Sequence, residues 1–226
     1  MAHWYLIHGA ASSRLTWTRQ LAVLPEVSRA SLPAFETVAP TALIDAWADY
    51  CLSDLTQPSV VMGHSLGGAI ALTMALKAPT MILGLVLVGT APRLPVNPDL
   101  LEALRTKPQE ALAKIVRWSL GPHADPLLLS RSLAQIASVD GRRAYREFLS
   151  CTYFDVVQDL PRITCPRAII AGERDRMTPL DLVKEFLKAW PDVPFYTVPE
   201  AGHMMMLENP DAFNDILRNI AKRFHW

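Results

Sequence analysis

The segment from residue 60 to residue 72 limits the folds open to this chain more than any other part of it. An apolar, β-branched run ends at Gly63, Ser65 follows, and a helix-forming stretch begins at Leu66. This order predicts a strand that passes directly into a helix, with Ser65 at the apex of the turn. Such a turn forces its central residue into an unfavourable backbone conformation, which requires small residues two positions before and after it. Gly63 and Gly67 occupy these positions.

The pattern Gly-x-Ser-x-Gly has two interpretations. In the first, Ser65 is an ordinary cap at the start of the following helix, a place that serine often takes. In the second, the turn lifts the Ser65 hydroxyl out of the sheet edge, beside the free N–H groups of a helix N-terminus, and makes it a candidate nucleophile. A serine hydroxyl is a weak nucleophile at neutral pH, so the second interpretation requires a base and an orienting acid elsewhere in the chain.

The charge balance limits the classes of partner. The 226 residues include 22 Lys and Arg against 22 Asp and Glu, so the formal net charge is zero. Proteins that hold nucleic acid or a membrane surface electrostatically carry a basic excess. We therefore expect no nucleic-acid partner and no membrane attachment. Half of the residues are apolar, which is enough for a substantial core in a single domain.

The first residues and the cysteines indicate the compartment. The N-terminus lacks the charged start and long apolar run of a leader, and no apolar segment reaches the about 18 residues of a membrane span. Cys51, Cys151 and Cys165 are far apart, and no pair has metal-ligand spacing. Such cysteine usage fits a reducing compartment. We expect a cytoplasmic protein, monomeric or dimeric, without a metal ion or cofactor.

Short apolar runs alternate with helical patterns along the chain. Strands are predicted at 4–7, 60–63, 81–89, 166–172 and 195–198, with a further short strand at 35–39. Helices are predicted at 15–24, 42–52 with Thr41 as its cap, 66–76, 180–190 and 212–224. This alternation predicts a mainly parallel sheet that is covered by helices on both faces and joined by right-handed crossovers.

The rhythm of strands and helices is interrupted once. From residue 99 to residue 149, apolar residues recur at helical spacing with polar residues between them, which predicts about four short helices. Because this block contains no strand pattern of its own, we expect one domain over residues 1–226. Its core is formed by 1–92 and 151–226, and 93–150 is a helical insertion.

Three polar residues follow predicted strands, at the sheet edge where reactive groups gather in such folds. They are Ser65, Asp175 and His203, in that chain order. Imidazole titrates near neutrality and is a suitable base for a serine within about 2.6–3.2 Å. A carboxylate on the other ring nitrogen fixes the tautomer and stabilises the imidazolium that forms. The sequence thus predicts Ser65 as nucleophile, His203 as base and Asp175 as the orienting acid.

An anionic oxygen formed on the substrate needs preorganised donors. We expect one from the backbone N–H of Leu66, directly after Ser65, and a second from the N–H of Ala10 in the loop after the first strand. His8 is expected to order this loop through its side chain. His64 competes with His203 for the role of base, but its place on the strained turn predicts a packing role. Three acidic residues compete with Asp175, namely Asp155, Glu173 and Asp181.

Four segments together resemble the α/β-hydrolase fold family. They are Gly63-His64-Ser65-Leu66-Gly67-Gly68, His8-Gly9 after the first strand, Gly172-Glu173-Arg174-Asp175, and Gly202-His203 with Glu208-Asn209-Pro210 beyond it. The resemblance covers essentially the whole chain, and the 93–150 block looks like the helical lid of the family. It implies a Ser-His-Asp esterase without a cofactor, in which the acyl group passes to Ser65 and then to water. Asp175 matches the family position of the acid.

Within the family, the chain is similar to small intracellular carboxylesterases, including the pimeloyl-carrier-protein methyl ester esterases. It departs from the family pattern in two places. The first two family strands are absent, because the strand that ends at His8-Gly9 opens the chain. The family's Asp-x-x-Gly-x-Gly stretch is also missing, and residues 29–40 take its place. The resemblance therefore implies a trimmed sheet of about six strands.

For side chains outside the three candidate residues we expect structural or substrate-binding roles. Glu208 is expected to cap or steady the last helix. Arg142, Arg143 and Arg146 in the lid either attract an acidic substrate or form a solvated helix face, and the solvated face is the default. Met204 and its neighbours either line an acyl pocket or pack in the core.

Several functions remain open at this stage. The leading hypothesis is a carboxylesterase that acts on a small-molecule ester, with the lid shaping an apolar acyl site. The same three residues would also serve cleavage of thioesters or carbon–carbon bonds, or the formation of peracids. A hypothesis from another class is a non-catalytic receptor that holds a small ligand under the lid.

Overall fold

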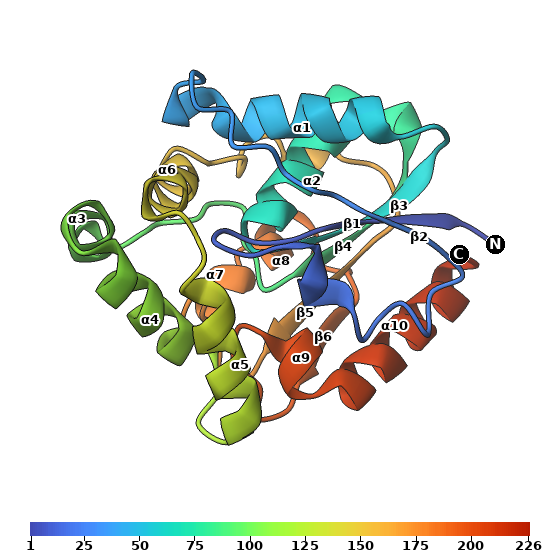
Figure 1. Cartoon of the computed structure of the whole chain (residues 1–226). Helices are drawn as coiled ribbons and strands as arrows, with labels where there is room; N and C mark the ends of the chain where they lie inside the picture. The colour runs from blue at the N-terminus through green and yellow to red at the C-terminus, as the bar shows by residue number, and fades with distance from the viewer.

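Six parallel strands form one sheet, with helices on both faces, in the computed structural model of residues 1–226 (Figure 1). The strands are β1 (His3–Ile7), β2 (Glu26–Arg29), β3 (Ser59–His64), β4 (Ile82–Val88), β5 (Arg167–Gly172) and β6 (Phe195–Val198). Their order across the sheet is β2-β1-β3-β4-β5-β6, and every neighbouring pair is parallel. The predicted α/β fold with a six-stranded sheet is confirmed.

Ten α-helices and four short 3-10 helices connect the strands. The α-helices are α1 (Leu43–Asp54), α2 (Leu66–Lys77), α3 (Pro98–Thr106), α4 (Pro108–Ser119), α5 (Pro126–Ile136), α6 (Gly141–Thr152), α7 (Leu180–Val183), α8 (Phe186–Ala189), α9 (Met205–Glu208) and α10 (Pro210–Phe224). The 3-10 helices are η1 (Arg14–Trp17), η2 (Pro40–Ala42), η3 (Pro79–Met81) and η4 (Leu160–Arg162). None of the helices has the length and apolar composition needed to cross a membrane.

The sheet separates two apolar layers because successive side chains of a strand point to opposite faces. Tyr5 and Ile7 of β1 pack with α1, α2 and α8, whereas Trp4 and Leu6 pack with α9 and α10. All four side chains are fully buried. Strands this apolar on both faces are typical of a parallel sheet covered on both sides, and Figure 1 shows the helices in these two layers.

Helices α3 to α6 follow β4 and precede β5 in the chain. They gather at one end of the molecule, beyond the sheet (Figure 1). A third apolar cluster holds α3, α4 and α6 together, with Leu104, Leu112 and Ala144 at its centre. Because Ala11 belongs to the same cluster, these helices pack directly on the loop that follows β1.

Two sequence predictions for the first forty residues are wrong. The helix expected at 15–24 is limited to η1, and the chain continues through turns with i→i+3 hydrogen bonds. Tertiary contacts outweigh helix propensity there: the buried Gln20 side chain donates to the Met206 carbonyl oxygen at 3.2 Å. The strand expected at 35–39 is a turn, in which the Val38 N–H donates to the Phe35 carbonyl oxygen.

The strand next to β1 is instead β2, which pairs with it from His3–Glu26 to Leu6–Arg29. A search for apolar runs overlooks β2 because it is a polar strand at the sheet edge, where one face is not covered by the core. The helix expected at 180–190 is also divided, into α7 and α8, with an i→i+3 hydrogen bond from the Glu185 N–H at the break.

Candidate active site

The order of the strands singles out one point on the sheet edge. From β1 the chain moves to β2 on one side, and it then crosses to β3 on the other side. In open α/β sheets, ligands bind outside the carboxyl ends of the strands at such a reversal. The loop after β1 and the turn after β3 meet there, and they carry Ala10 and Ser65.

The Ser65 turn has the strained geometry that the sequence predicts. Ser65 has φ 54° and ψ −119°, a conformation that side-chain-bearing residues rarely adopt. A Cβ atom at Gly63 would lie 2.2 Å from the Gly67 carbonyl oxygen, and one at Gly67 would lie 2.4 Å from the Ile7 carbonyl oxygen. Both positions therefore exclude a side chain. The Ser65 side chain makes no capping hydrogen bond to α2, so the capping interpretation does not hold.

The loops after β5 and β6 bring Asp175 and His203 into contact. The His203 Nδ1 atom lies 2.7 Å from the Asp175 Oδ2 atom, and both residues are buried. Asp175 Oδ1 also accepts the backbone N–H groups of Met177 and Thr178, at 2.8 and 2.9 Å. Burial alone would raise the pKa of Asp175, but the His203 ring and the Thr178 hydrogen bonds outweigh burial and lower it. The carboxylate is therefore ionised beside the ring.

The competing acidic residues do not reach His203. Asp155 accepts the Val157 N–H, Glu173 accepts the Glu200 N–H, and Asp181 pairs at 3.8 Å with Lys184 on the surface. Of these carboxylates, Asp175 alone contacts the ring.

His64 packs under His203. The His64 Nε2 atom donates to the His203 carbonyl oxygen at 3.0 Å, and the two ring centres lie 4.5 Å apart. Burial, helped by the neighbouring His203, lowers the pKa of His64 well below its usual value. A neutral ring fixed in this way supports the His203 loop and is a poor candidate for the base.

The backbone of the His203 loop is held on both sides. The His203 N–H donates to the Ser119 carbonyl oxygen at the end of α4, at 2.7 Å. The flanking N–H groups of Gly202 and Met204 donate to the Glu208 carboxylate, which also accepts the Gly121 N–H at 2.6 Å.

The expectation that Glu208 caps the last helix is therefore wrong. Asn209 caps α10, and its side chain accepts the Ala212 N–H. Glu208 instead joins the His203 loop to the turn after α4. A carboxylate surrounded by backbone donors satisfies polar groups that would otherwise be buried without partners.

The two predicted oxyanion donors belong to the segments that carry the candidate nucleophile and the loop after β1, and Ala10 and Ser65 line the same cavity. The Ala10 N–H donates to no group within the chain. Leu66 is the first residue of α2, a position whose N–H has no partner within the helix. The His8 Nδ1 atom hydrogen-bonds to the Gly9 carbonyl oxygen at 2.9 Å, and burial lowers the pKa of His8 to about 4. His8 is thus a neutral, buried part of the loop.

Ser65 and His203 line the same cavity, which occupies about 790 Å³ including its open mouth. The Ser65 hydroxyl makes no hydrogen bond to the His203 ring in this structure. Apolar side chains of the insertion cover the cavity, among them Ile115, Val116 and Phe148. Met204 also lines it, whereas Met205 and Met206 pack in the core.

A second cavity of about 770 Å³ adjoins the first. Ala10, Ser65, Phe148 and Met177 line both, so Ser65 stands at the junction of two lobes. The second lobe has mainly apolar walls, and Arg176 is the one charged residue among the residues that line it. Arg176 is exposed and forms no ion pair within the chain.

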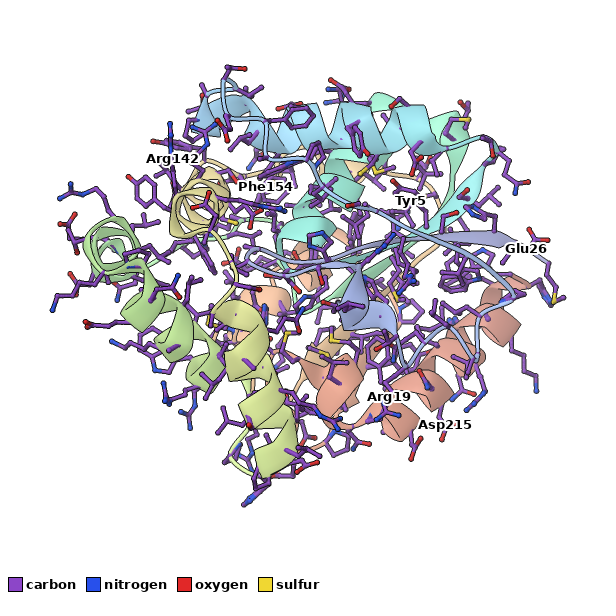
Figure 2. All side chains as sticks on the ribbon, viewed as in Figure 1. Tyr5, Arg19, Glu26, Arg142, Phe154 and Asp215 are labelled. Carbon is purple, nitrogen blue, oxygen red and sulfur yellow. The ribbon has the colours of Figure 1, made fainter.

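Three side chains of α6 have contacts that sequence reasoning did not foresee. Arg143 donates to the Leu32 carbonyl oxygen, and Arg146 donates to the carbonyl oxygen of Phe35. The expectation of a solvated arginine face therefore fails for Arg143 and Arg146, which hold the 29–40 segment in place. Arg142 is exposed and projects outward from α6 (Figure 2).

The third of these side chains is Glu147, which is buried and accepts the Ala11 N–H at 2.6 Å. The burial of Glu147 could have been predicted from its position, because it lies on the same helix face as the buried residues Ala144, Phe148 and Cys151.

No group of three or more His, Cys, Asp or Glu side chains is arranged to hold a metal ion. The arrangement is thus a half-buried hydroxyl at a strained turn, a histidine oriented by an ionised carboxylate, and two backbone N–H groups on segments that border the same cavity. Such a set of groups can carry out nucleophilic acyl transfer.

The comparisons with known proteins agree with this chemistry. The model of a family described as the alpha/beta hydrolase family matches residues 5–216. A pimeloyl-acyl-carrier-protein methyl ester esterase of Chromobacterium violaceum is 27% identical over 94% of this chain and 89% of its own length. An enzyme of the same name from Aromatoleum aromaticum is 24% identical over 96% and 97%. Among solved structures, a thermophilic esterase is 28% identical with a TM-score of 0.85, covering 99% of this chain and 91% of its own.

Proposed function

This chain belongs to the alpha/beta hydrolase family, and on that premise we propose that it is a carboxylesterase with a catalytic triad of Ser65, His203 and Asp175. The observation that carries the proposal is the 2.7 Å hydrogen bond between Asp175 and His203 Nδ1. Because this contact occupies Nδ1, the other ring nitrogen is left to act on the Ser65 hydroxyl, which lines the same cavity.

The reaction proceeds in two halves. His203 Nε2 takes the hydroxyl proton as Ser65 Oγ attacks the ester carbonyl, and Asp175 stabilises the imidazolium that forms. The imidazolium then gives its proton to the departing alcohol, which leaves the acyl group on Ser65. In the second half, His203 activates a water molecule, the acyl-serine bond breaks, and the carboxylic acid is released.

Both halves pass through a tetrahedral intermediate with a negative oxygen. The N–H groups of Leu66 and Ala10 are proposed as its donors, and the absence of another partner for the Ala10 N–H supports this role. One such donor contributes about 2.7–4 kcal/mol of transition-state stabilisation in a comparable site. The hydroxyl–imidazole hydrogen bond is commonly long in unliganded enzymes and shortens when substrate binds.

The two lobes suggest that different parts of the substrate bind in different places. We propose that the acyl group and the alcohol occupy one lobe each, because Ser65 stands at their junction. The mainly apolar walls suit a hydrocarbon chain. The unpaired guanidinium of Arg176 in the second lobe favours a substrate whose chain in that lobe ends in an anionic group. The curated relatives are named as esterases of pimeloyl-acyl-carrier-protein methyl ester, and an ester of an apolar acyl chain is consistent with those names.

The proposal also covers the setting of the site. Residues 93–150 serve as a helical lid on a single domain, and the reaction takes place in the cytoplasm. The three cysteines are all free, with Cys51 and Cys151 buried, which suits a reducing compartment.

A fluorophosphonate probe tests the nucleophile, since it reacts with activated serines. We expect labelling of the wild-type protein and none of Ser65→Ala. Unlabelled wild type, or equal labelling of the variant, would remove Ser65 from its role.

The reaction is identified with a substrate panel. It compares short and medium p-nitrophenyl esters, acyl-thioesters and substrates that are cleaved at a carbon–carbon bond, and a separate assay measures peracid formation. The proposal expects the oxygen esters to be turned over fastest, with the activity lost in His203→Ala. Tight ligand binding without turnover of any panel member would favour a receptor instead.

A further inference from the structure

The loop that follows β1 is fastened to the helical insertion at one backbone atom. The Ala11 N–H donates to the Glu147 Oε2 atom of α6 at 2.6 Å, although the two residues are 136 positions apart. Ala11 has φ 50°, an unusual conformation for a residue with a side chain. This conformation needs support from its surroundings, and the Glu147 carboxylate supplies it.

The Glu147 side chain is only 2% exposed, and a second contact holds it in place. Its Oε1 atom accepts Arg143 Nε at 2.7 Å, and Arg143 continues to the Leu32 carbonyl oxygen at 3.2 Å. Burial raises the pKa of Glu147, and the nearby Arg143 and the Ala11 N–H oppose that rise. Only the carboxylate of this pair is buried, since the Arg143 side chain is 32% exposed. Because removing a carboxylate from water offsets much of its attraction to a cation, such a pair is often no more stabilising than apolar side chains of similar volume. Stability alone is therefore a weak explanation for Glu147.

The position of the contact supplies a better explanation. Ala11 directly follows Ala10, whose N–H has no partner within the chain and is the proposed second oxyanion donor. The direction of an N–H is set by the backbone torsions on either side of it. On one side the loop is fixed by the buried His8 and Gly9, and on the other side by the Glu147–Ala11 hydrogen bond.

We propose that Glu147, oriented by Arg143, is a positioning residue that holds the Ala10 N–H in the direction in which it donates to the substrate oxyanion. The inference rests on the proposed function, since it assigns a role within that reaction. It makes the helical insertion part of the oxyanion site, in addition to its role as a cover. Phe148, the next residue on α6, lines both lobes, so one turn of helix shapes the cavity and aligns the donor.

The test compares three substitutions that separate the acceptor atom from the charge. Glu147→Ala removes the acceptor. Glu147→Asp keeps the charge next to Arg143 but is one methylene too short to reach the Ala11 N–H. Glu147→Gln keeps a carbonyl oxygen at the right distance without the charge. We expect kcat to fall by about 10- to 100-fold in the Ala and Asp variants, because a misaligned oxyanion donor costs somewhat less than a lost one. KM should change little, and Gln should restore kcat to within about threefold of wild type.

A second readout separates positioning from mere support of the fold. A trifluoromethyl ketone forms a tetrahedral adduct with a nucleophilic serine, and its oxygen occupies the oxyanion site, whereas an amide analogue of the substrate does not form an adduct. The Ala and Asp variants should lose affinity for the ketone by the same factor as kcat/KM and keep their affinity for the amide. Arg146→Gln is the matched control, because it removes a half-buried contact of the same helix to residue 35 and leaves Ala11 untouched. It should lower the unfolding temperature without changing kcat.

Wild-type kcat and ketone affinity in folded Glu147→Ala or Glu147→Asp would overturn the proposal. If Glu147→Ala does not fold, the Asp and Gln variants still decide the matter. Equal kcat in those two would also overturn it. A failure of the proposed function is seen separately, as an absence of ester turnover and of Ser65 labelling in the wild-type protein.

Discussion

His203 Nδ1 and Asp175 Oδ2 are 2.7 Å apart, although they lie 28 positions apart in loops that follow different strands. The carboxylate is held independently of the ring, since it accepts two backbone N–H groups and the Thr178 hydroxyl. Asp175 is therefore in position before any substrate arrives. The ring orientation depends on Asp175, and several consequences can be measured.

Replacing Asp175 by Asn should preserve the fold and remove most of the activity. The amide can donate to Nδ1 and stabilise the wrong tautomer, which leaves Nε2 protonated and unable to take the Ser65 proton. A fall in kcat of about 10⁴-fold is expected from the comparable substitution in another triad. Steady-state kinetics on a p-nitrophenyl ester measures it. Activity within tenfold of wild type would show that another acid orients His203.

Alanine at Gly63 should prevent folding of the Ser65 turn. The added methyl group would lie 2.2 Å from the Gly67 carbonyl oxygen, and the backbone on both sides is buried in the sheet. We expect a loss of about 4 kcal/mol or more in the free energy of unfolding, which lowers the unfolding temperature by about 10 °C. Calorimetry or the yield of folded protein measures this loss.

Gly84→Ala is the control for that experiment. Its methyl group would meet the Trp226 ring at 2.0 Å, but the atoms that it meets belong to a half-buried side chain, which can move aside more readily than backbone. The effect should be clearly smaller than at Gly63. Equal losses at the two positions would contradict the steric argument.

The buried His8 should make the protein less stable in mild acid. Its pKa is lowered to about 4, whereas in the unfolded chain it is near 6.5. The unfolded state therefore binds more protons between these values, so stability is full above pH 6.5, falls as the pH drops and levels off below about pH 4. Between pH 7 and pH 5 the expected loss from His8 is about 2 kcal/mol.

Urea unfolding of wild type and His8→Asn at both pH values isolates this contribution. Asn keeps a donor for the Gly9 carbonyl oxygen but does not titrate. The variant should lose about 2 kcal/mol less than wild type on acidification. An identical pH dependence of the two proteins would show that His8 is free to become charged in the folded state.

Arg176 should make the enzyme prefer an ester whose chain ends in a carboxylate. For two esters of equal chain length, one ending in a carboxylate and one in a methyl group, Arg176→Gln should lower the ratio of kcat/KM values by about fivefold. The effect is modest because Arg176 is exposed and its attraction is screened by water. It should shrink further at high salt.

Arg174 is the matched control for Arg176. It is exposed in the same loop and pairs with Glu200 at 2.9 Å outside the cavities. Arg174→Gln should leave the ratio unchanged. An equal change in both variants would point to the overall charge of the loop and not to a contact in the second lobe.

The parts of the molecule that the sequence predicts well are those with local signals. The Ser65 turn needs small residues at Gly63 and Gly67, so its geometry can be predicted from five consecutive residues. The buried central strands are apolar throughout, and the helical insertion has a clear period. Asp175 and His203 each follow such a strand, and the topology of a parallel sheet then brings their loops to the same edge.

The elements that were missed depend on distant parts of the chain. β2 is polar, and it is a strand only because β1 offers it a partner. The segment after Trp17 has helix-forming residues, but contacts with α9 and α10 decide its shape. Arg143 and Glu147 have the i,i+4 spacing of a surface ion pair, and Arg146 has the sequence context of an exposed helical residue, which are the usual meanings of such patterns. Their burial follows from the way α6 packs on the 29–40 segment, and no local pattern encodes that.

The hydrogen bonds between the helical insertion and the loops of the site restrict how the cavity can open for substrate and product. The end of α4 is tied to the His203 N–H, and α6 is tied to the Ala11 N–H. A movement of α4 and α6 together away from the sheet would break both hydrogen bonds and displace the loops that carry His203 and Ala11. By contrast, α5 contributes no fully buried residue, yet Ser132, Gln135 and Ile136 border the first lobe. Substitutions along α5 are therefore expected to change which molecules fit the first lobe, while the hydrogen bonds that hold His203 and Ala11 stay intact.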